Sequence, residues 1–363
     1  MRILHIITSL YTGGAETLVA NLMPYFHALG HEVGVVVLKD IRTPLMERLE
    51  KECPECKIFK IGSSFYNPWH IVKLSRIMRQ YDIVHTHNTS PQFFAAIAAK
   101  VLCPKTLVTT EHNTSNRRRD WKCYPRWIDR WMYNQYRQVI CISRQAEDNL
   151  RAFIGHSRAE ITTIFNGVDV EAFHLAKANP SLRNGSKRFV AVMVAGFRHQ
   201  KDQDTLIKAM THLDADEYEL WLVGDGVRRG ELEALVASLG LQDRVRLLGQ
   251  RTDVPEILHT ADVVVMSSHF EGLSLSNIEG MSVGKPFIAS DVDGLHEMTQ
   301  GAGLLFPQGD DKALATLIKQ LHDDKLFYQH VADACYEKAK QFDIKKMVEN
   351  YNIVYEKLKT QQS

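Results

Sequence analysis

Two glutamates, Glu271 and Glu279, flank a segment whose composition suits an anion-binding turn. The residues between them are Gly-Leu-Ser-Leu-Ser-Asn-Ile, and apolar strands are expected directly before and after, at 261–266 and 286–290. A helix beginning in this segment would point unpaired backbone N–H groups and the positive end of its dipole at a phosphate group. A carboxylate in the loop and another in the first turns of the helix would then grip hydroxyl groups on either side of a diphosphate. We therefore interpret the segment as a candidate nucleotide-sugar site.

Histidines follow two other expected strands. His85 and His87 end a strand at 83–87, and His112 follows a strand at 107–110. A histidine at the carboxyl end of a strand can orient a sugar hydroxyl or accept a proton. The alternative is a polar residue that is simply hydrogen-bonded at a strand end, and we favour the functional interpretation for His112 alone. Three histidines also raise the question of zinc, but such spacing is common by chance.

Two basic residues, Arg198 and Lys201, follow the first strand of the second half of the chain, at 189–195. Two cations close together after a strand would offset the charge of a diphosphate leaving group. The alternative is a pair of solvated surface charges. Gly196 begins the same segment and is a further candidate for donor binding.

Glycine turns follow two more strands. Gly13-Gly14 lies between a strand at 3–8 and an expected helix, and Gly224-Asp225-Gly226 follows a strand at 218–223. Glycine lets the backbone approach a ligand closely, so Gly14 is a candidate contact for an anion and Gly224 for a nucleoside. The Gly-Gly turn lacks the GxGxxG dinucleotide fingerprint, and the alternative is a tight turn between strand and helix.

These residues require a scaffold of strands and helices in alternation, which is typical of parallel α/β sheets. Further strands are expected at 32–38, 138–142 and 245–248, and a helix at 15–29 ends at Gly30. We predict two doubly wound, Rossmann-like domains facing across a cleft: an acceptor-side domain at 1–168 and a donor domain at 188–342. Residues 169–187 would connect them, and a helical tail at about 343–363 would pack back on the first domain. Such domains bind ligands at the carboxyl ends of their strands.

The composition is that of a soluble globular protein of 363 residues, with 45% hydrophobic and 24% charged residues. A formal net charge of +1 argues against a general nucleic-acid binder. We find no signal peptide and no apolar run long enough to span a bilayer, so we predict a cytoplasmic protein. The six cysteines are scattered, and Cys53 and Cys56 lack a second ligand pair for zinc.

Taken in order, these segments resemble the retaining glycosyltransferases of the GT-B fold in family four, also known as group 1. The resemblance is strongest over 196–297, and its most specific part runs from Ser267 through Glu279 and then comprises Gly284-Lys285-Pro286. Weaker matches occur at 13–16, His112 and 164–169. Together these matches cover most of the chain.

The resemblance implies a role for each matching residue. Glu271 would hold hydroxyls of the donor sugar, Glu279 would bind the ribose, and Lys201 would neutralise the diphosphate. Gly14 would approach the diphosphate from the other domain, and His112 would lie beside the reacting sugar. The backbone of the turn would contact sugar and phosphate through Gly272, Leu273, Ser274, Leu275 and Ser276.

The chain departs from the family at one position. The family often places its diphosphate arginine five residues before the lysine, where this chain has Gly196, so we assign that role to Arg198 instead. The resemblance implies no metal and no other cofactor. Asp214-Ala215-Asp216 is similar to a metal-binding Asp-x-Asp, but it precedes a strand, and we interpret it as a surface loop.

Residues 114–137 form a distinct segment on the acceptor side. Seven lysines or arginines stand here against two aspartates, together with three of the five tryptophans. Arginine beside tryptophan is typical of contact with a membrane surface. The alternative is that Trp127 and Trp131 pack on the sheet while the arginines are solvated. The resemblance favours the membrane, because many such enzymes extend lipid-linked glycans.

We therefore predict a metal-independent glycosyltransferase of the hexosyltransferase class. It would move a hexose or N-acetylhexosamine, with retention, from a nucleotide-sugar to a hydroxyl of a glycan or lipid-linked acceptor in cell-surface polysaccharide synthesis. UDP is the favoured nucleotide. The alternatives are a nucleotide-sugar epimerase or hydrolase and a non-catalytic GT-B subunit.

Overall fold

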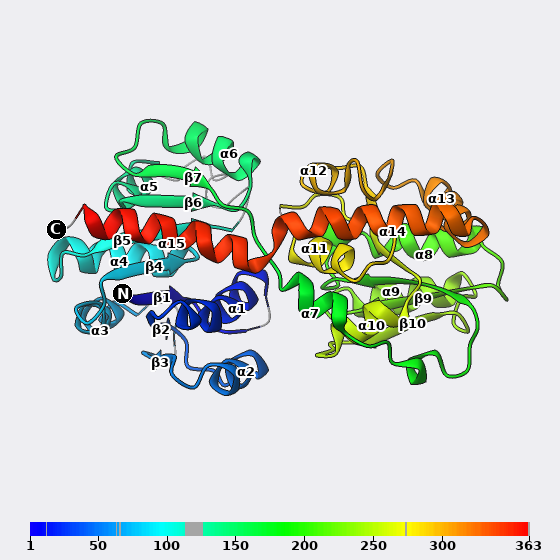
Figure 1. The fold of residues 1–363 in the computed structure, drawn as a ribbon, viewed down its shortest axis with the longest axis horizontal. Coiled ribbons are helices and arrows are strands. Elements are labelled where there is room, and N and C mark those ends of the chain that lie inside the picture. The colour runs from blue at the N-terminus through cyan, green and yellow to red at the C-terminus, as the bar shows by residue number, and fades with distance from the viewer. Residues whose placement is uncertain (12, 63, 65–66, 113–125, 273, 362–363) are drawn as a thin grey trace. The chain divides into compact units, whose positions relative to one another are not determined.

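The computed structural model describes the chain except for residues 12, 63, 65–66, 113–125, 273 and 362–363. The chain divides into two compact units, and each is built on its own sheet (Figure 1). The first unit comprises Met1–Gly167 and Ile344–Ser363, and the second comprises Val168–Asp343.

The first unit contains a parallel sheet in the order β3-β2-β1-β4-β5-β6-β7. Its strands are β1 (Arg2–Ile7), β2 (Glu32–Val37), β3 (Lys57–Lys60), β4 (Ile83–His87), β5 (Thr106–Glu111), β6 (Gln138–Cys141) and β7 (Glu160–Thr163). The strands in the middle of the sheet are buried along almost their whole length. This burial is expected where helices cover both faces of a parallel sheet, and it explains the continuous apolar runs.

Seven helices complete this unit within the described residues. They are α1 (Gly14–Ala28), α2 (Pro44–Glu52), α3 (Trp69–Met78), α4 (Thr89–Val101), α5 (Arg126–Tyr133), α6 (Arg144–Ile154) and α15 (Ile344–Thr360). Helix α15 comes from the end of the chain, packs against α1 and lies along the first unit (Figure 1). It buries one face at helical spacing, with Met347, Tyr351, Tyr355 and Leu358 among the buried side chains.

The second unit contains a parallel sheet in the order β10-β9-β8-β11-β12-β13. Its strands are β8 (Phe189–Val194), β9 (Tyr218–Val223), β10 (Val245–Gly249), β11 (Val263–Met266), β12 (Phe287–Ser290) and β13 (Leu304–Phe306). Its helices are α7 (Val170–Leu175), α8 (Gln203–Ala209), α9 (Arg229–Ser238), α10 (Val254–Thr260), α11 (Leu275–Ser282), α12 (Leu295–Thr299), α13 (Asp311–Asp323) and α14 (Lys325–Ala339). Strand β8 is followed by β9 on one side, whereas β11 returns to its other side, so the strand order reverses between β8 and β11.

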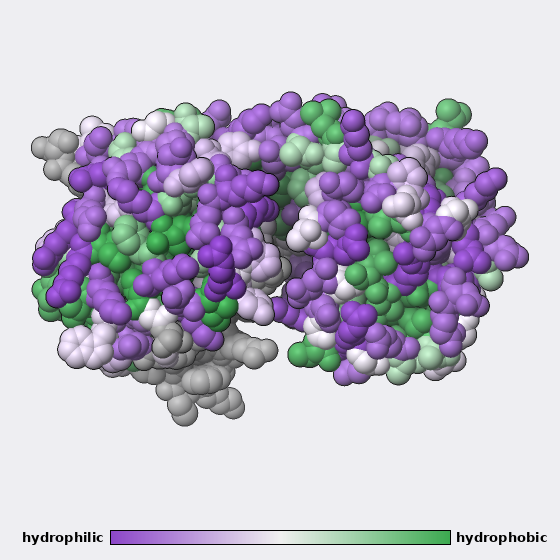
Figure 2. All heavy atoms as spheres, turned by 90° about the horizontal axis from the view of Figure 1, so that it is seen from below, coloured by the Kyte–Doolittle hydropathy of each residue, from purple (hydrophilic) through white to green (hydrophobic). Residues whose placement is uncertain are grey.

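The predicted α/β class with two parallel sheets is confirmed. The segment 169–187, expected as a connection, contains α7 and a short 3₁₀ turn (Pro180–Arg183) and belongs to the second unit. Arg183 fixes it there, because its guanidinium donates to the carbonyl of Thr260 and pairs with Asp262 at 2.7 Å. No helix in the described part of the chain is long and apolar enough to cross a membrane. The face seen in Figure 2 is mostly hydrophilic, with small hydrophobic patches on both units.

Candidate functional site

The carboxyl ends of β8 and β11 bring two of the predicted residues into contact. Lys201 ends a short 3₁₀ turn (His199–Lys201) that follows β8, and Glu271 lies in the loop after β11. The Lys201 ammonium donates to Oε1 of Glu271, although 70 residues separate them in the chain. In doubly wound sheets, ligands bind at the point where the strand order reverses, which here lies between these two strands.

The Lys201–Glu271 ion pair is largely withdrawn from water and held by a hydroxyl. Side-chain exposure is 18% for Lys201 and 6% for Glu271. Ser268 donates to the same carboxylate oxygen at 2.7 Å, and Ser290 at the end of β12 donates to the Ser268 carbonyl at 2.6 Å. A buried carboxylate is tolerated only when it is paired and hydrogen-bonded, and both conditions are met here.

The loops that carry the pair are tied to each other. Ser267 donates through its hydroxyl to the carbonyl of Asp202 at 2.7 Å, and His269 donates its backbone N–H to the Gln200 carbonyl at 2.8 Å. Asp202 adopts a left-handed conformation (φ 46°) and caps α8 by accepting the backbone N–H of Thr205 at 3.4 Å, and it also accepts the Thr205 hydroxyl at 2.6 Å. Lys201 is therefore placed by the start of α8 on one side and by the β11 loop on the other.

Gly294, which the sequence reasoning missed, lies against the Glu271 loop. It has φ +81°, and a Cβ at this position would stand 2.4 Å from the Glu271 carbonyl oxygen and 2.8 Å from that of Gly272. Only a residue without a side chain fits this close approach. The loop after β12 thus supports the backbone of the candidate site.

Gly224 and Gly196 differ in what they require. Gly224 has φ +138°, and a Cβ there would lie 2.1 Å from the Ala195 carbonyl oxygen, so its close approach is to the end of β8. At Gly196 a Cβ would make only ordinary contacts, the nearest at 3.8 Å.

Arg198 is exposed and makes no ion pair with any residue that the structure describes, unlike Lys201. The structure therefore joins Lys201 to Glu271 and leaves Arg198 outside this contact.

The predicted anion-binding helix is α11, which starts at Leu275. Ser274 is its N-cap residue but forms no capping hydrogen bond through its side chain, so the hydroxyl does not block the helix start. Ser276 lies in the first turn, and half-buried Glu279 lies four residues into the helix. Leu273 lies outside the described residues. Asn277, which was not predicted, is buried with both amide atoms unpaired within the described chain.

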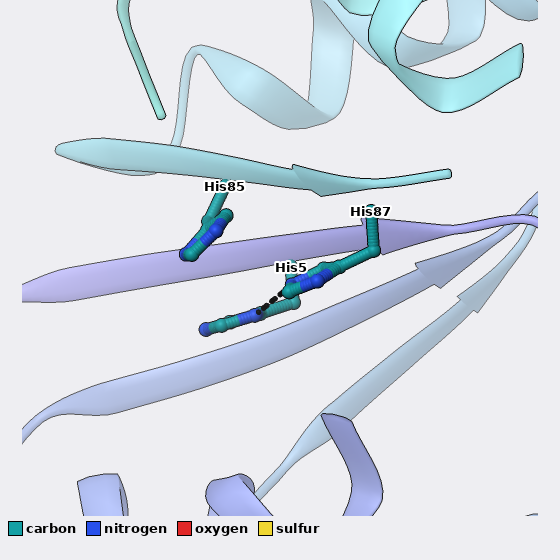
Figure 3. Close-up of side chains that lie close together, drawn as sticks. All are labelled: His5, His85 and His87. Atoms are coloured by element: carbon teal, nitrogen blue, oxygen red, sulfur yellow. Dashed lines mark hydrogen bonds between the residues drawn. The ribbon is translucent and has the colours of Figure 1, made fainter. Parts of the chain in front are cut away.

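The first unit brings four histidines together at β1, β4 and the end of β5. His5 lies on β1, and His85 and His87 lie on β4 (Figure 3). His112 follows β5. Nδ1 of His5 is 2.9 Å from Nε2 of His87, and Nδ1 of His87 is 2.9 Å from Nε2 of His112. His112 and His87 are therefore linked directly, and His5 was missed because it stands alone in an apolar strand.

His85 belongs to a different set of hydrogen bonds. Its Nδ1 meets the Tyr355 hydroxyl on α15 at 2.5 Å, and its Nε2 meets Thr110 Oγ1 at 2.7 Å. Tyr351 approaches the same threonine hydroxyl at 3.2 Å. Because both ring nitrogens are occupied, His85 fastens α15 to the sheet, as in the alternative interpretation of a hydrogen-bonded polar residue.

Burial keeps the rings in this cluster neutral near pH 7. It lowers the pKa of His5 to about 3 and, despite the opposing effect of Glu111, the pKa of His112 to about 4. The pKa values of His85 and His87 lie well below the usual range for the same reason. A neutral imidazole carries one N–H and one lone pair, so each ring can donate one hydrogen bond and accept one.

Gly14 begins α1, directly after the Gly13 N-cap, and has open space around its Cα. A Cβ at Gly13 would instead meet the Glu16 carboxylate at 2.4 Å. Glu16 accepts a hydrogen bond from Asn88 at 3.3 Å, and burial raises its pKa. The start of α1 is thus accessible to a ligand, which is the property that the prediction for Gly14 requires.

The Arg/Trp segment is only partly described, since residues 114–125 lie outside the described chain. Its remainder is mostly α5, where Trp127 is 70% exposed. Trp131 instead packs against Phe93, with ring centroids 6.1 Å apart. The two tryptophans therefore behave differently: Trp131 joins the core, as the alternative interpretation expected, whereas Trp127 does not.

Two family profiles match consecutive parts of the chain. The profile of Glycosyltransferase Family 4 matches residues 12–172, and that of Glycosyl transferases group 1 matches residues 176–342. Among curated proteins, the chain is 30% identical over 312 residues to EpsF of Bacillus subtilis, which is assigned as a glycosyltransferase. This match covers 80% of the chain and 79% of EpsF.

A second relative is the UDP-Gal:α-D-GlcNAc-diphosphoundecaprenol α-1,3-galactosyltransferase of Escherichia coli. It is 27% identical over 289 residues, which cover 76% of this chain and 74% of that protein. Among solved structures, HepE of Anabaena in complex with UDP-glucose is similar, with a TM-score of 0.83 and 22% identity. That match covers 98% of this chain and all of HepE.

Proposed function

Because the chain belongs to glycosyltransferase family 4, with the GT-B fold, we propose that it transfers a hexose or N-acetylhexosamine, with retention, from a UDP-sugar to a hydroxyl group. The observation that carries this proposal is the Lys201–Glu271 ion pair at the reversal of strand order in the second unit. A cation and an anion held side by side match the two chemical halves of a nucleotide-sugar, its diphosphate and its sugar hydroxyls.

When the nucleotide-sugar binds, it replaces the contact between Lys201 and Glu271 with contacts of its own to each residue. A carboxylate only accepts hydrogen bonds and an ammonium only donates them. Donor oxygens therefore replace Glu271 at Lys201, and sugar hydroxyls replace Lys201 at Glu271. Ser268 keeps Glu271 in place during this exchange, because its hydroxyl donates to the carboxylate independently of Lys201.

Catalysis then comes mainly from stabilising the departing diphosphate. Lys201 and the backbone amides from Gly272 to Ser276 at the start of α11 supply positive charge, and exposed Arg198 adds a further cation. Glu279 holds the ribose, and Gly196 and Gly224 line the nucleotide side. Because these groups provide the charge that a divalent cation would supply, the proposed reaction is independent of metal.

The acceptor is a glycan or a lipid-linked glycan, used in the synthesis of cell-surface polysaccharide. The Escherichia coli relative supports this proposal, since its printed substrates are UDP-Gal and a diphosphoundecaprenol-linked sugar. HepE, solved with UDP-glucose, supports the choice of UDP. Exposed Trp127 and the basic residues of 114–137 would meet the cytoplasmic face of the membrane, where such lipid-linked acceptors are presented.

A panel of UDP-sugars, incubated with and without lipid-linked acceptors, tests the function. Transfer should need both substrates, and the NMR coupling constant of the product should show the anomeric configuration of the donor. Consumption of the donor without acceptor would favour the hydrolase or epimerase. Failure of every donor to bind would favour the non-catalytic subunit, since a true ligand at 100 times its Kd should raise the unfolding free energy by about 2.7 kcal/mol.

A further inference from the structure

Three histidines form a hydrogen-bonded chain that ends at His112, and the ring nitrogens at its two ends lie in different surroundings. It runs from His5 through His87 to His112 by two contacts of 2.9 Å. At one end, Nε2 of His5 is buried without a hydrogen-bond partner in the described part of the chain. At the other end, the structure shows a single hydrogen bond for the His112 ring among the described residues, through Nε2. Among the described residues Nδ1 of His112 therefore has no partner, and we assign it to the ligand.

The ring geometry favours a hydrogen-bonded chain over a metal site. His5, His85 and His87 have potential ligand atoms within 4.8 Å of one another. The rings of His5 and His87 are nearly parallel, however, with 12° between their planes, and their facing nitrogens are 2.9 Å apart, as in a direct hydrogen bond. A neutral His85 has one lone pair and one N–H, and both are engaged by Tyr355 and Thr110, so it has no lone pair left for a metal ion. Figure 3 marks the contact between His5 and His87 with a dashed line.

The direction of the hydrogen bonds follows from the unpaired nitrogen of His5. If the protons point from His112 towards His5, then Nδ1 of His5 accepts, and its own proton must sit on buried, unpaired Nε2. If they point from His5 towards His112, the unpaired atom is only a lone pair. A buried N–H without a partner is the rarer situation in folded proteins, so the second direction is preferred.

We propose that His5 and His87 are positioning residues that hold His112 in its Nδ1–H tautomer, so that His112 donates a hydrogen bond to an oxygen of the donor sugar. This inference rests on the proposed function and on the family resemblance, which implies that His112 lies beside the reacting sugar. It makes His112 a donor and not a base, because its only lone pair is occupied by the Nδ1–H of His87. In this proposal, transfer with retention of the anomeric configuration does not require His112 to remove a proton.

The tautomer can be read from the full-length protein without any substrate. Two-bond ¹H–¹⁵N correlation spectra of histidine-labelled protein distinguish a protonated ring nitrogen from an unprotonated one. The signals of His112 are assigned by their loss in His112→Asn. We expect Nδ1 protonated and Nε2 unprotonated in the wild-type protein at pH 7. The opposite pattern would overturn the inference whether or not the protein transfers sugar.

His87→Leu removes the donor to His112, whereas His85→Gln is the matched control. His85 is equally buried, lies two residues away on β4 and stacks on His87 at 4.5 Å, but makes no bond to His112. We expect His87→Leu to restore a mixture of His112 tautomers and to lower turnover about tenfold, a barrier change of about 1.4 kcal/mol. His85→Gln should keep the Nδ1–H tautomer and turnover within twofold.

His5→Asn provides a second test should His87→Leu fail to fold. An asparagine amide can accept from His87 as well as donate to it, so the direction of the chain is no longer fixed. Both tautomers of His112 should then appear, and turnover should fall in proportion to the Nε2–H fraction. An unchanged His112 spectrum in His5→Asn would contradict a role for His5, and an unchanged spectrum in His87→Leu would contradict the whole inference.

Discussion

Each member of the Lys201–Glu271 pair stabilises a charge that would otherwise be buried alone. Lys201→Ala should therefore reduce the unfolding free energy by about 1–3 kcal/mol, because Glu271 is left with Ser268 as its partner. It should also lower kcat at least about 100-fold, by analogy with the loss of one preorganised donor to a developing anion. Lys208→Ala, an exposed lysine on α8, is the control and should change neither quantity.

The double variant Lys201→Met/Glu271→Gln separates the effect on stability from that on catalysis. Removal of both charges takes away the unpaired carboxylate, so urea denaturation should show more stability than in Lys201→Ala. Turnover should remain lost, because neither the diphosphate nor the sugar has its charged partner. A double variant less stable than Lys201→Ala would contradict a paired, desolvated Glu271.

At the scale of elements, the Glu271 loop depends on the turn before α12. Gly294→Ala places a Cβ against the carbonyls of Glu271 and Gly272 and forces a left-handed conformation on alanine. We expect a loss of more than about 1 kcal/mol in stability and a raised KM for the donor. Gly301→Ala is matched, since Gly301 has φ +78° with nothing within 4 Å of a Cβ. It should lose about 1 kcal/mol of stability with an unchanged KM.

Helix α15 depends on the hydrogen bond between Tyr355 and His85. Tyr355→Phe leaves Nδ1 of His85 buried without a partner, which should reduce the unfolding free energy by about 1–3 kcal/mol. Tyr11→Phe, on a ring that is 60% exposed, is the control for loss of a phenol and should be neutral. Thermal unfolding of the two variants compares them directly, and equal midpoints would contradict the role assigned to His85.

Strands buried on both faces were predictable, whereas of the four strands at sheet edges only β10 was predicted, at 245–248. Strand β4 was predicted at its observed bounds, because apolar residues run directly into two histidines at a buried strand end. Strands β3, β7 and β13 were missed, and all three lie at sheet edges, where half-exposed sequences such as Lys57–Lys60 lack a continuous apolar run. Contacts between segments that are distant in the sequence leave no pattern in the local sequence, so they could not be predicted from it. Gly294 and His5 act through segments distant in the sequence, so neither could be found by spacing alone.

At the scale of the whole molecule, the two units differ in their buried histidines. The first contains His5, His31, His85, His87 and His112, all with pKa values lowered mainly by burial, and the shift is large for all of them except His31. In the unfolded chain each has a pKa near 6.5, so below that pH the unfolded state binds more protons than the folded one. The stability of the first unit must therefore fall as the pH drops through 6.5, and it is fully present only above about pH 7.5.

The size of this effect gives the final prediction. Between pH 7 and pH 5.5, each of the four histidines with a large shift should remove about 1.2 kcal/mol, so the first unit should lose about 5 kcal/mol. Pulse proteolysis in urea, with fragments identified by mass spectrometry, should show residues 1–167 becoming cleavable at lower urea at pH 5.5. The described part of the second unit should change less, since burial lowers the histidine pKa there only for His259. In His5→Phe the pH-dependent loss should shrink by about a quarter, whereas equal acid sensitivity of both units would contradict the neutral state of the cluster.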